Sequence, residues 1–254
     1  MTNASKPQDR MLAILVIVAT IATVAFNGLA AAGYVNGVTP AAISAKYPTI
    51  LTPAGYAFTI WSLIYLGLAA FSIYQILPAN LSRYRSVRPL YIFSCILNCG
   101  WIYFWHREQI TACFVIILAL WLMLLLIEVK LQGCRSFAET WLQQAPFGLY
   151  FGWVTVASIV NLMVLLTFLG VNMPERPGTI LASVLIAVAV GSAVAVRAKL
   201  RNFFYPLAIA WALTAIAVKQ SANTAIVIAA AFGVVICLVT TGSFVVNLKD
   251  STSE

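Results

Sequence analysis

Residues 52–65, with the sequence TPAGYAFTIWSLIY, join a backbone break to the start of a long apolar run. Proline and glycine supply the break, and aromatic residues follow it at regular intervals. Phe58, Trp61 and Tyr65 are spaced at i, i+3 and i+7, so we expect them to share one face of a helix. Aliphatic side chains alone would be enough for a membrane span. The aromatic face therefore indicates either tight packing or a binding surface.

The composition of the whole chain identifies its class. Of the 254 residues, 62% are hydrophobic and only 9% are charged, whereas a soluble domain carries about 25% charged residues. The sequence therefore predicts an all-α, polytopic helix bundle embedded in a lipid bilayer. The net charge of +8 does not indicate a nucleic-acid partner, because the few basic residues fall in short loops between apolar runs.

Eight apolar stretches are candidates for membrane spans, since about 20 helical residues cross the hydrocarbon core. They are residues 11–32, 56–77, 90–105, 110–127, 147–169, 180–196, 203–218 and 225–246. The seventh is short and begins with aromatic residues suited to a membrane interface.

The basic residues in the connections predict the orientation, because cytoplasmic loops carry an excess of lysine and arginine. A cytoplasmic N-terminus places eleven basic residues on the inner side and four on the outer side. The inner group is Lys6, Arg10, Arg83, Arg85, Arg88, Lys130, Arg135, Arg197, Lys199, Arg201 and Lys249, and the outer group is Lys46, Arg107, Arg176 and Lys219. We therefore expect both termini to be cytoplasmic. The densest inner loop, RYRSVRP at residues 83–89, is interpreted as an orientation signal or, alternatively, as a contact for anionic lipids.

The connection between the first two spans, residues 33–52, is the longest on the outer side. Its prolines exclude one regular helix. We expect it to fold as a lid over the outer mouth of the bundle, with Pro48, Pro53 and Gly55 among its residues.

The third span carries Asn98, Trp101 and Trp105 on one face. An asparagine within a span needs a hydrogen-bond partner, so we expect Asn98 to face the bundle. The only histidine, His106, follows at the end of this span and is expected to be a polar cap at the interface. A single histidine cannot supply the paired ligands of many zinc sites.

The fifth span places Tyr150, Trp153 and Asn161 on one face. Its Gly148 and Gly152 form a small-xxx-small pair, which favours the close approach of another helix. After Gly170 the composition changes to spans rich in alanine, valine and isoleucine. We therefore expect two structural units, residues 1–170 and residues 171–254.

Three stretches, in this order, resemble the TspO/MBR family, the tryptophan-rich sensory proteins related to the translocator protein. Residues 53–65, PAGYAFTIWSLIY, are similar to the family's Pro-Pro-Gly-aromatic-x-Phe…Trp-Thr-x-x-Tyr pattern at the second helix. Residues 97–108, LNCGWIYFWHRE, are similar to its Leu-Asn-x-x-Trp-x-x-x-Phe-Phe third helix. Residues 145–161, APFGLYFGWVTVASIVN, are similar to its Pro-Tyr-x-x-Trp-x-x-x-Ala-x-x-x-Asn fifth helix.

The chain departs from the family pattern in several places. Ala54 replaces the second proline, and the interval from Phe58 to Trp61 is one residue shorter than usual. Trp105 stands where phenylalanine is common. The last three spans lie outside the five-helix core. The chain is therefore identified as a divergent, extended relative.

The resemblance implies a five-helix core, residues 1–170, that encloses a pocket, with residues 171–254 as a three-helix extension. Family members bind porphyrins, haem-related compounds, sterols and synthetic aromatic ligands, and are often dimers. This implies a porphyrin or haem-like ligand, a homodimer in the bacterial inner (plasma) membrane, no obligatory cofactor and no metal site. Carried over by position, the pocket wall is Phe58, Trp61, Tyr65, Asn98, Trp101, Trp105, Tyr150, Trp153 and Asn161.

Two functions remain open on the sequence. The first is the binding of a flat hydrophobic ligand in a sensory or transport-accessory role. The alternative is a transporter or facilitator of a small apolar solute. Ion-coupled transport is disfavoured, because no ionisable residue is securely placed at the bilayer centre. No nucleophile–base pair or metal cluster stands out in the sequence, so no catalytic residue is predicted and an enzyme is not expected.

Overall fold

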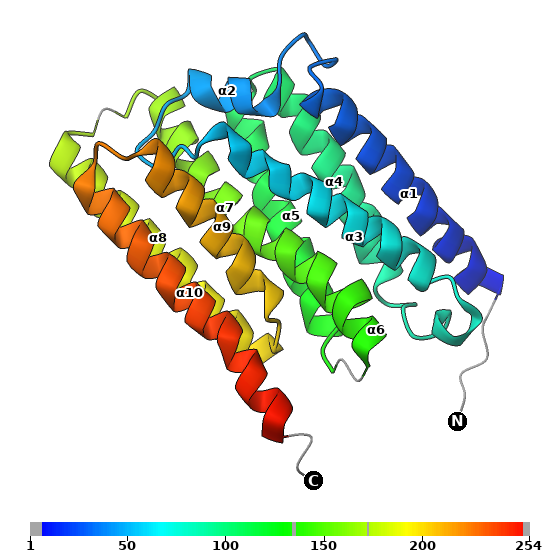
Figure 1. The fold of residues 1–254 in the computed structure, drawn as a ribbon. Helices are drawn as coiled ribbons and strands as arrows, with labels where there is room; N and C mark the ends of the chain where they lie inside the picture. The colour runs from blue at the N-terminus through cyan, green and yellow to red at the C-terminus, as the bar shows by residue number, and fades with distance from the viewer. Residues whose placement is uncertain (1–6, 134–135, 172, 251–254) are drawn as a thin grey trace. The chain divides into compact units, whose positions relative to one another are not determined.

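The computed structural model describes residues 7–133, 136–171 and 173–250, with side chains described up to residue 243. The side chains of Lys6, Arg135 and Lys249, which entered the orientation count, lie outside the described residues. The described part of the chain is helical and has no strand (Figure 1). Its long helices are α1 (Pro7–Ala31), α3 (Ile60–Tyr74), α4 (Arg88–His106), α5 (Ile110–Lys130), α7 (Ala145–Phe168), α8 (Glu175–Leu200), α9 (Phe204–Lys219) and α10 (Thr224–Asp250).

Shorter elements lie in the connections. They are α2 (Pro40–Lys46), the 3-10 turns η1 (Gly55–Thr59) and η2 (Pro78–Asn80), and the run of α6 (Phe137–Glu139) and the π-helical turn η3 (Thr140–Gln144). A short helix and irregular backbone therefore form the connection from α1 to α3, as its prolines predicted.

The eight long helices of the described residues correspond one to one with the predicted spans. Six helical stretches are long and apolar enough to cross a membrane: Pro7–Ala31, Gly55–Tyr74, Ile110–Lys130, Phe137–Phe168, Glu175–Leu200 and Thr224–Ser243. Helix α9 is apolar but has only 16 residues. Helix α4 has 19 residues and includes Arg88, Asn98 and His106. The predicted class, a polytopic membrane helix bundle, is confirmed.

Helix α1 has a polar buried side and an apolar exposed side. Its buried residues recur at intervals of three and four, the spacing of a helix-packing seam: Asp9, Ala13, Val16, Thr20, Thr23, Asn27 and Ala30. Its exposed side carries aliphatic residues such as Ile21, which is 64% exposed. This seam packs on α4, where the Thr20 hydroxyl lies 2.7 Å from the Tyr91 hydroxyl. Polar groups inside and hydrocarbon outside are typical of helices whose solvent is lipid.

The chain divides into two compact units. Unit 1 comprises the described residues of Met1–Ile43 and Trp61–Phe147, and unit 2 those of Ser44–Ile60 and Gly148–Glu254. This division does not coincide with the expected one at residues 170 and 171, because most of α7 groups with the last three helices. A Cβ atom on Gly152 would overlap the carbonyl oxygen of Tyr205 at the start of α9. The predicted small-xxx-small pair is thus a packing site between α7 and α9.

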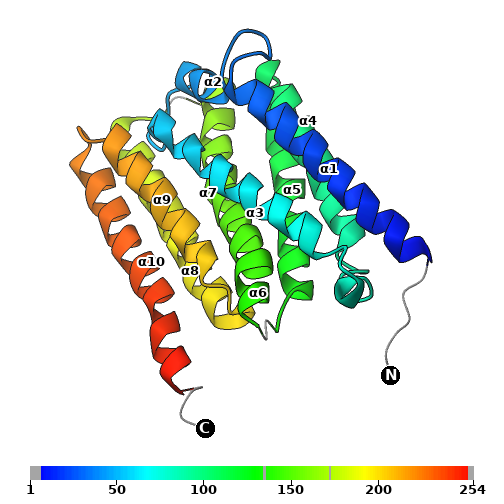
Figure 2. The same ribbon diagram turned by 45° about the vertical axis from the view of Figure 1, so that its right-hand side comes forward.

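In unit 2, α8, α9 and α10 lie side by side (Figure 1, Figure 2). The buried Tyr205 joins three helices, because its hydroxyl lies 2.8 Å from Thr155 Oγ1 of α7 and 2.9 Å from Ser192 Oγ of α8. Asn202, three residues before Tyr205, caps α9, because its Oδ1 accepts hydrogen bonds from the backbone amides of Phe204 and Tyr205.

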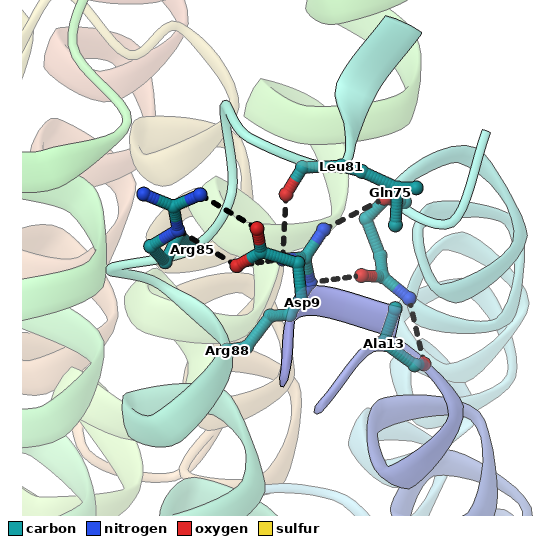
Figure 3. A network of polar contacts seen from close by, with 6 residues as sticks. All are labelled: Asp9, Ala13, Gln75, Leu81, Arg85 and Arg88. Carbon is teal, nitrogen blue, oxygen red and sulfur yellow. Dashed lines mark hydrogen bonds and ion pairs between the residues drawn. The ribbon is translucent and has the colours of Figure 1, made fainter. Parts of the chain in front are cut away.

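The three arginines of the basic loop at residues 83–89 have carboxylate partners within unit 1. Arg83 forms an ion pair with Glu139 of α6. Arg85 donates from Nε and Nη2 to the two carboxylate oxygens of Asp9, at 2.7 and 2.6 Å (Figure 3). These hydrogen bonds raise the pKa of the Arg85 guanidinium above its ordinary value.

Arg88 is the most deeply buried of the three, at 1% exposed. Figure 3 shows its guanidinium among neutral acceptors: it donates to Gln75 Oε1 at 2.7 Å, to the Leu81 carbonyl at 2.7 Å and to the Gln75 carbonyl at 3.1 Å. Its Nη1 also lies 3.9 Å from Asp9 Oδ1. Each of the three arginines thus has a partner on unit 1, and the side chains of Arg83 and Arg85 also stay partly exposed. The alternative interpretation of this loop as a contact for anionic lipids stays a prediction.

Candidate functional site

The nine residues expected to line the pocket fall into two groups, one in each unit. Unit 1 holds Trp61, Tyr65, Asn98, Trp101 and Trp105, and unit 2 holds Phe58, Tyr150, Trp153 and Asn161.

In unit 1 an aromatic pair adjoins an amide. The ring of Tyr65 meets the ring of Trp61 edge to face, with 6.3 Å between centroids. The Tyr65 hydroxyl accepts a hydrogen bond from Asn98 Nδ2 at 3.4 Å. Asn98 itself is buried, as predicted for an asparagine that faces the bundle.

Asn98 also has a partner that the sequence analysis missed. Asn27 of α1 donates from Nδ2 to Asn98 Oδ1 at 2.6 Å and to the Thr23 carbonyl at 2.9 Å. Asn27 is 1% exposed, and its Oδ1 has no hydrogen-bond partner among the residues that the structure describes. The signal was available, because Asn27 is also an amide within an apolar span and needs a partner for the same reason as Asn98.

The two tryptophans of α4 stack on each other. The rings of Trp101 and Trp105 are 5.1 Å apart and inclined by 18°, and both residues are buried. The Trp105 indole donates to the Pro40 carbonyl at 3.1 Å. This places one of the predicted wall residues against the start of α2.

His106, which we expected to be a polar cap at the membrane interface, is buried. It is 5% exposed, with Nδ1 at 2.9 Å from the Ile102 carbonyl and Nε2 at 3.3 Å from the Val38 carbonyl. The C-terminal end of α4 therefore makes several hydrogen bonds to the connection that follows α1, and the histidine is one of the residues that make them.

In unit 2 the ring of Phe58 meets the ring of Trp153 edge to face, with 5.8 Å between centroids. Phe58 lies in the 3-10 turn η1 rather than in an α-helix, since α3 begins only at Ile60. Phe58 therefore lies outside the α-helix that carries Trp61 and Tyr65, and the common face of the three residues stays a prediction. Tight i→i+3 turns are frequent where a helix starts, and the proline–glycine break favours one here.

Tyr150, Trp153 and Asn161 of α7 are all buried, at 5%, 8% and 4% exposed. Asn161 donates from Nδ2 to the Ala157 carbonyl of its own helix at 2.9 Å. Residues 145–156 of α7 are all buried, so burial does not distinguish one side of this helix, and the common face of the three residues stays a prediction.

The predicted lid residues lie in an irregular stretch with hydrogen bonds of its own. Pro48 and Pro53 flank it, and Gly55 begins η1. Within it the Thr49 amide donates to Thr52 Oγ1 at 2.7 Å, and the Thr52 amide donates to the Thr49 carbonyl at 3.0 Å. Whether this stretch acts as a lid stays a prediction.

Both groups consist of uncharged side chains, namely aromatic rings and amides. Aromatic rings and amides supply flat apolar area and a few hydrogen bonds, without a charged side chain among the nine residues. Among the residues described, no three His, Cys, Asp or Glu side chains lie close enough together to hold a metal ion.

A comparison with protein families gives one match. A family model described as TSPO-like protein matches residues 13–243. The match includes the last three helices, which the sequence analysis had placed outside the family core, so they are part of what this family model describes. No curated protein and no solved structure matches the chain.

Proposed function

The chain belongs to the family of TSPO-like proteins, and from this premise we propose that it binds a flat, hydrophobic ligand of the tetrapyrrole class within the bilayer. The observation that supports the proposal most is the contact of Trp61, Tyr65 and Asn98 in unit 1. It combines ring faces with a buried amide that can orient a ligand. The role is sensory or accessory to transport.

The side chains of the predicted wall match the proposed ligand in chemistry. Offset or edge-to-face ring contacts add about 0.5–1.5 kcal/mol per pair beyond burial. A conjugated macrocycle offers several such contacts at once. An amide adds a directed hydrogen bond without a buried charge, which is costly to place in hydrocarbon.

The proposal is tested by titrating the purified protein in detergent with a free-base porphyrin. The dissociation constant is read from the absorbance of the porphyrin, because mutation of a tryptophan also changes protein fluorescence. We expect Trp61→Ala and Tyr65→Ala each to raise the Kd by about tenfold, the equivalent of one lost ring contact with its burial.

The matched control is Trp141→Ala. Trp141 is 52% exposed and lies in η3, where its ring contacts that of Phe137, and neither residue belongs to the predicted wall. Its removal should leave the Kd unchanged. Equal affinities in the wild type and in both wall variants would refute the proposal, as would a wild-type protein that does not bind porphyrin.

A further inference from the structure

Helix α9 holds the backbone that leads into η1. Figure 2 shows the segment ahead of α3 beside the C-terminal end of α9, both in unit 2. Four hydrogen bonds connect α9 and its C-cap residue to residues 49–57. The sequence did not indicate a role for the last three helices. The contact of α9 with residues 49–57 indicates one.

All four hydrogen bonds use the backbone of the segment. The Gln220 side-chain amide donates to the Thr49 carbonyl at 3.0 Å and to the Thr52 carbonyl at 3.1 Å. The Ala54 amide donates to the Ala215 carbonyl at 2.9 Å. The Trp211 indole donates to the Ala57 carbonyl at 2.9 Å. Irregular backbone has few internal partners for its polar groups, and α9 supplies them here.

Side chains reinforce the same contact. The ring of Tyr56 meets the ring of Trp211 edge to face, with 5.5 Å between centroids. Leu51, Thr52 and Ala57 are buried. The segment is therefore fixed to α9 at both of its ends, near residue 49 and near residue 57.

We propose that Trp211 and Gln220 are positioning residues, which hold residues 49–57 and thereby place Phe58 against Trp153 for ligand binding. Ala57 directly precedes Phe58, so a shift of the Ala57 carbonyl moves the Phe58 ring. Opening of the segment requires the loss of the bonds to α9. The part of this inference that concerns the ligand rests on the proposed function, whereas the part that concerns the segment does not.

The first experiment measures amide hydrogen exchange in the full chain in detergent, without ligand. The variants are Gln220→Glu, which keeps the shape but removes the donor, and Trp211→Phe, which keeps an aromatic ring but removes the indole N–H. Each should make the amides of residues 50–57 exchange several times faster, because opening then breaks fewer bonds.

The matched control is Asn223→Ala. Asn223 lies in the turn that follows α9, and its Nδ2 contacts Thr179 Oγ1 at 3.5 Å rather than the segment. This variant should leave exchange at residues 50–57 unchanged. Unchanged exchange in both Gln220→Glu and Trp211→Phe would overturn the proposal, and so would an equal acceleration in Asn223→Ala.

The second experiment follows the kinetics of porphyrin binding by stopped flow. In Gln220→Glu both association and dissociation should accelerate several-fold, with a smaller change in Kd, because a looser segment opens more often. A purely structural role would lower the melting temperature without changing these rates, and that result would overturn positioning. If the wild type binds no porphyrin, the proposed function fails, and hydrogen exchange still decides whether α9 holds the segment.

Discussion

At the scale of single residues, Asn27 and Asn98 are the polar contact between α1 and α4 that bears most on the candidate site. Each is an amide placed within an apolar helix, and each is buried. Their mutual hydrogen bond at 2.6 Å leaves Asn98 Nδ2 directed at the Tyr65 hydroxyl. The packing of α1 therefore helps to orient the amide that we assign to ligand recognition.

We expect Asn98→Leu to lower the free energy of unfolding by about 1 kcal/mol, the typical size of an interhelical hydrogen bond in a bilayer. Asn27→Leu should have a similar effect. The double variant should lose less than the sum, since both single changes remove the same bond. Unfolding by sodium dodecyl sulfate in mixed micelles measures all three.

The control for this cycle is Thr167→Val. The Thr167 hydroxyl donates to the Met163 carbonyl of its own helix at 3.1 Å, so its loss removes a hydrogen bond within one helix rather than between two. Strict additivity of the two asparagine changes would contradict the assigned coupling.

At the scale of elements, the approach of α7 to α9 depends on the absence of a side chain at two positions. A Cβ atom on Gly148 would overlap the Asn202 side chain that caps α9. A Cβ atom on Gly152 would lie 2.9 Å from the Ala208 Cβ, and closer still to the Tyr205 carbonyl oxygen. Backbone cannot move aside as a flexible side chain can.

Gly152→Ala should therefore destabilise the protein by about 1–3 kcal/mol, the usual cost of overpacking. Gly191→Ala in α8 is the matched change, because a Cβ atom there would meet nothing within 4 Å. That variant should be neutral or slightly stabilising, since alanine is the better helix former. Thermal unfolding of both variants, monitored by circular dichroism, gives the comparison; equal melting temperatures would contradict the assigned packing.

The helices were predictable from the sequence because the signal for a membrane span is local. Runs of apolar residues located α1, α5 and α8, although α8 extends from residue 175 to residue 200, beyond the predicted 180–196. What could not be predicted depends on partners distant in the chain. The grouping of α7 with α9 depends on Tyr205, and the burial of His106 involves the Val38 carbonyl.

The candidate site, too, was predictable from the sequence only in part. The spacing of Asn98, Trp101 and Trp105 predicted a buried face, and all three are buried. Phe58 was assigned to a helix because its spacing fits one, yet it lies in the 3-10 turn η1, and α3 begins only after this turn, at Ile60. Asn27 was not predicted, because it has no aromatic stripe beside it in the first span. The rule that an amide within an apolar span needs a hydrogen-bond partner applies to it equally.

At the scale of the whole molecule, the distribution of charge predicts how the helices enter the membrane. Eleven basic residues against four indicate cytoplasmic termini for eight spans. Arg83, Arg85 and Arg88 belong to the larger group, although they are also paired within unit 1. Structural pairing and orientation therefore draw on the same side chains.

We expect a cytoplasm-active reporter, such as a fluorescent protein, to be active when fused to either terminus. A periplasm-active reporter inserted after Arg107, between α4 and α5, should be active as well, because that connection lies on the outer side. Activity of the cytoplasmic reporter at only one terminus would contradict an even number of spans.

The ion pair between Asp9 and Arg85 has a consequence for biosynthesis. The ribosome makes Asp9 first, and the whole of α1, the connection and α3 follow before Arg85 and Arg88 emerge. A carboxylate without a cation is costly in hydrocarbon, so the first turn of α1 stays at the membrane face until its partners arrive. Gln75, which follows α3 and precedes these arginines, can already donate to the Ala13 carbonyl of α1. The nascent chain therefore acquires its ion pairs with Asp9 only when the third long helix begins, after a neutral link between α1 and the end of α3 has become available.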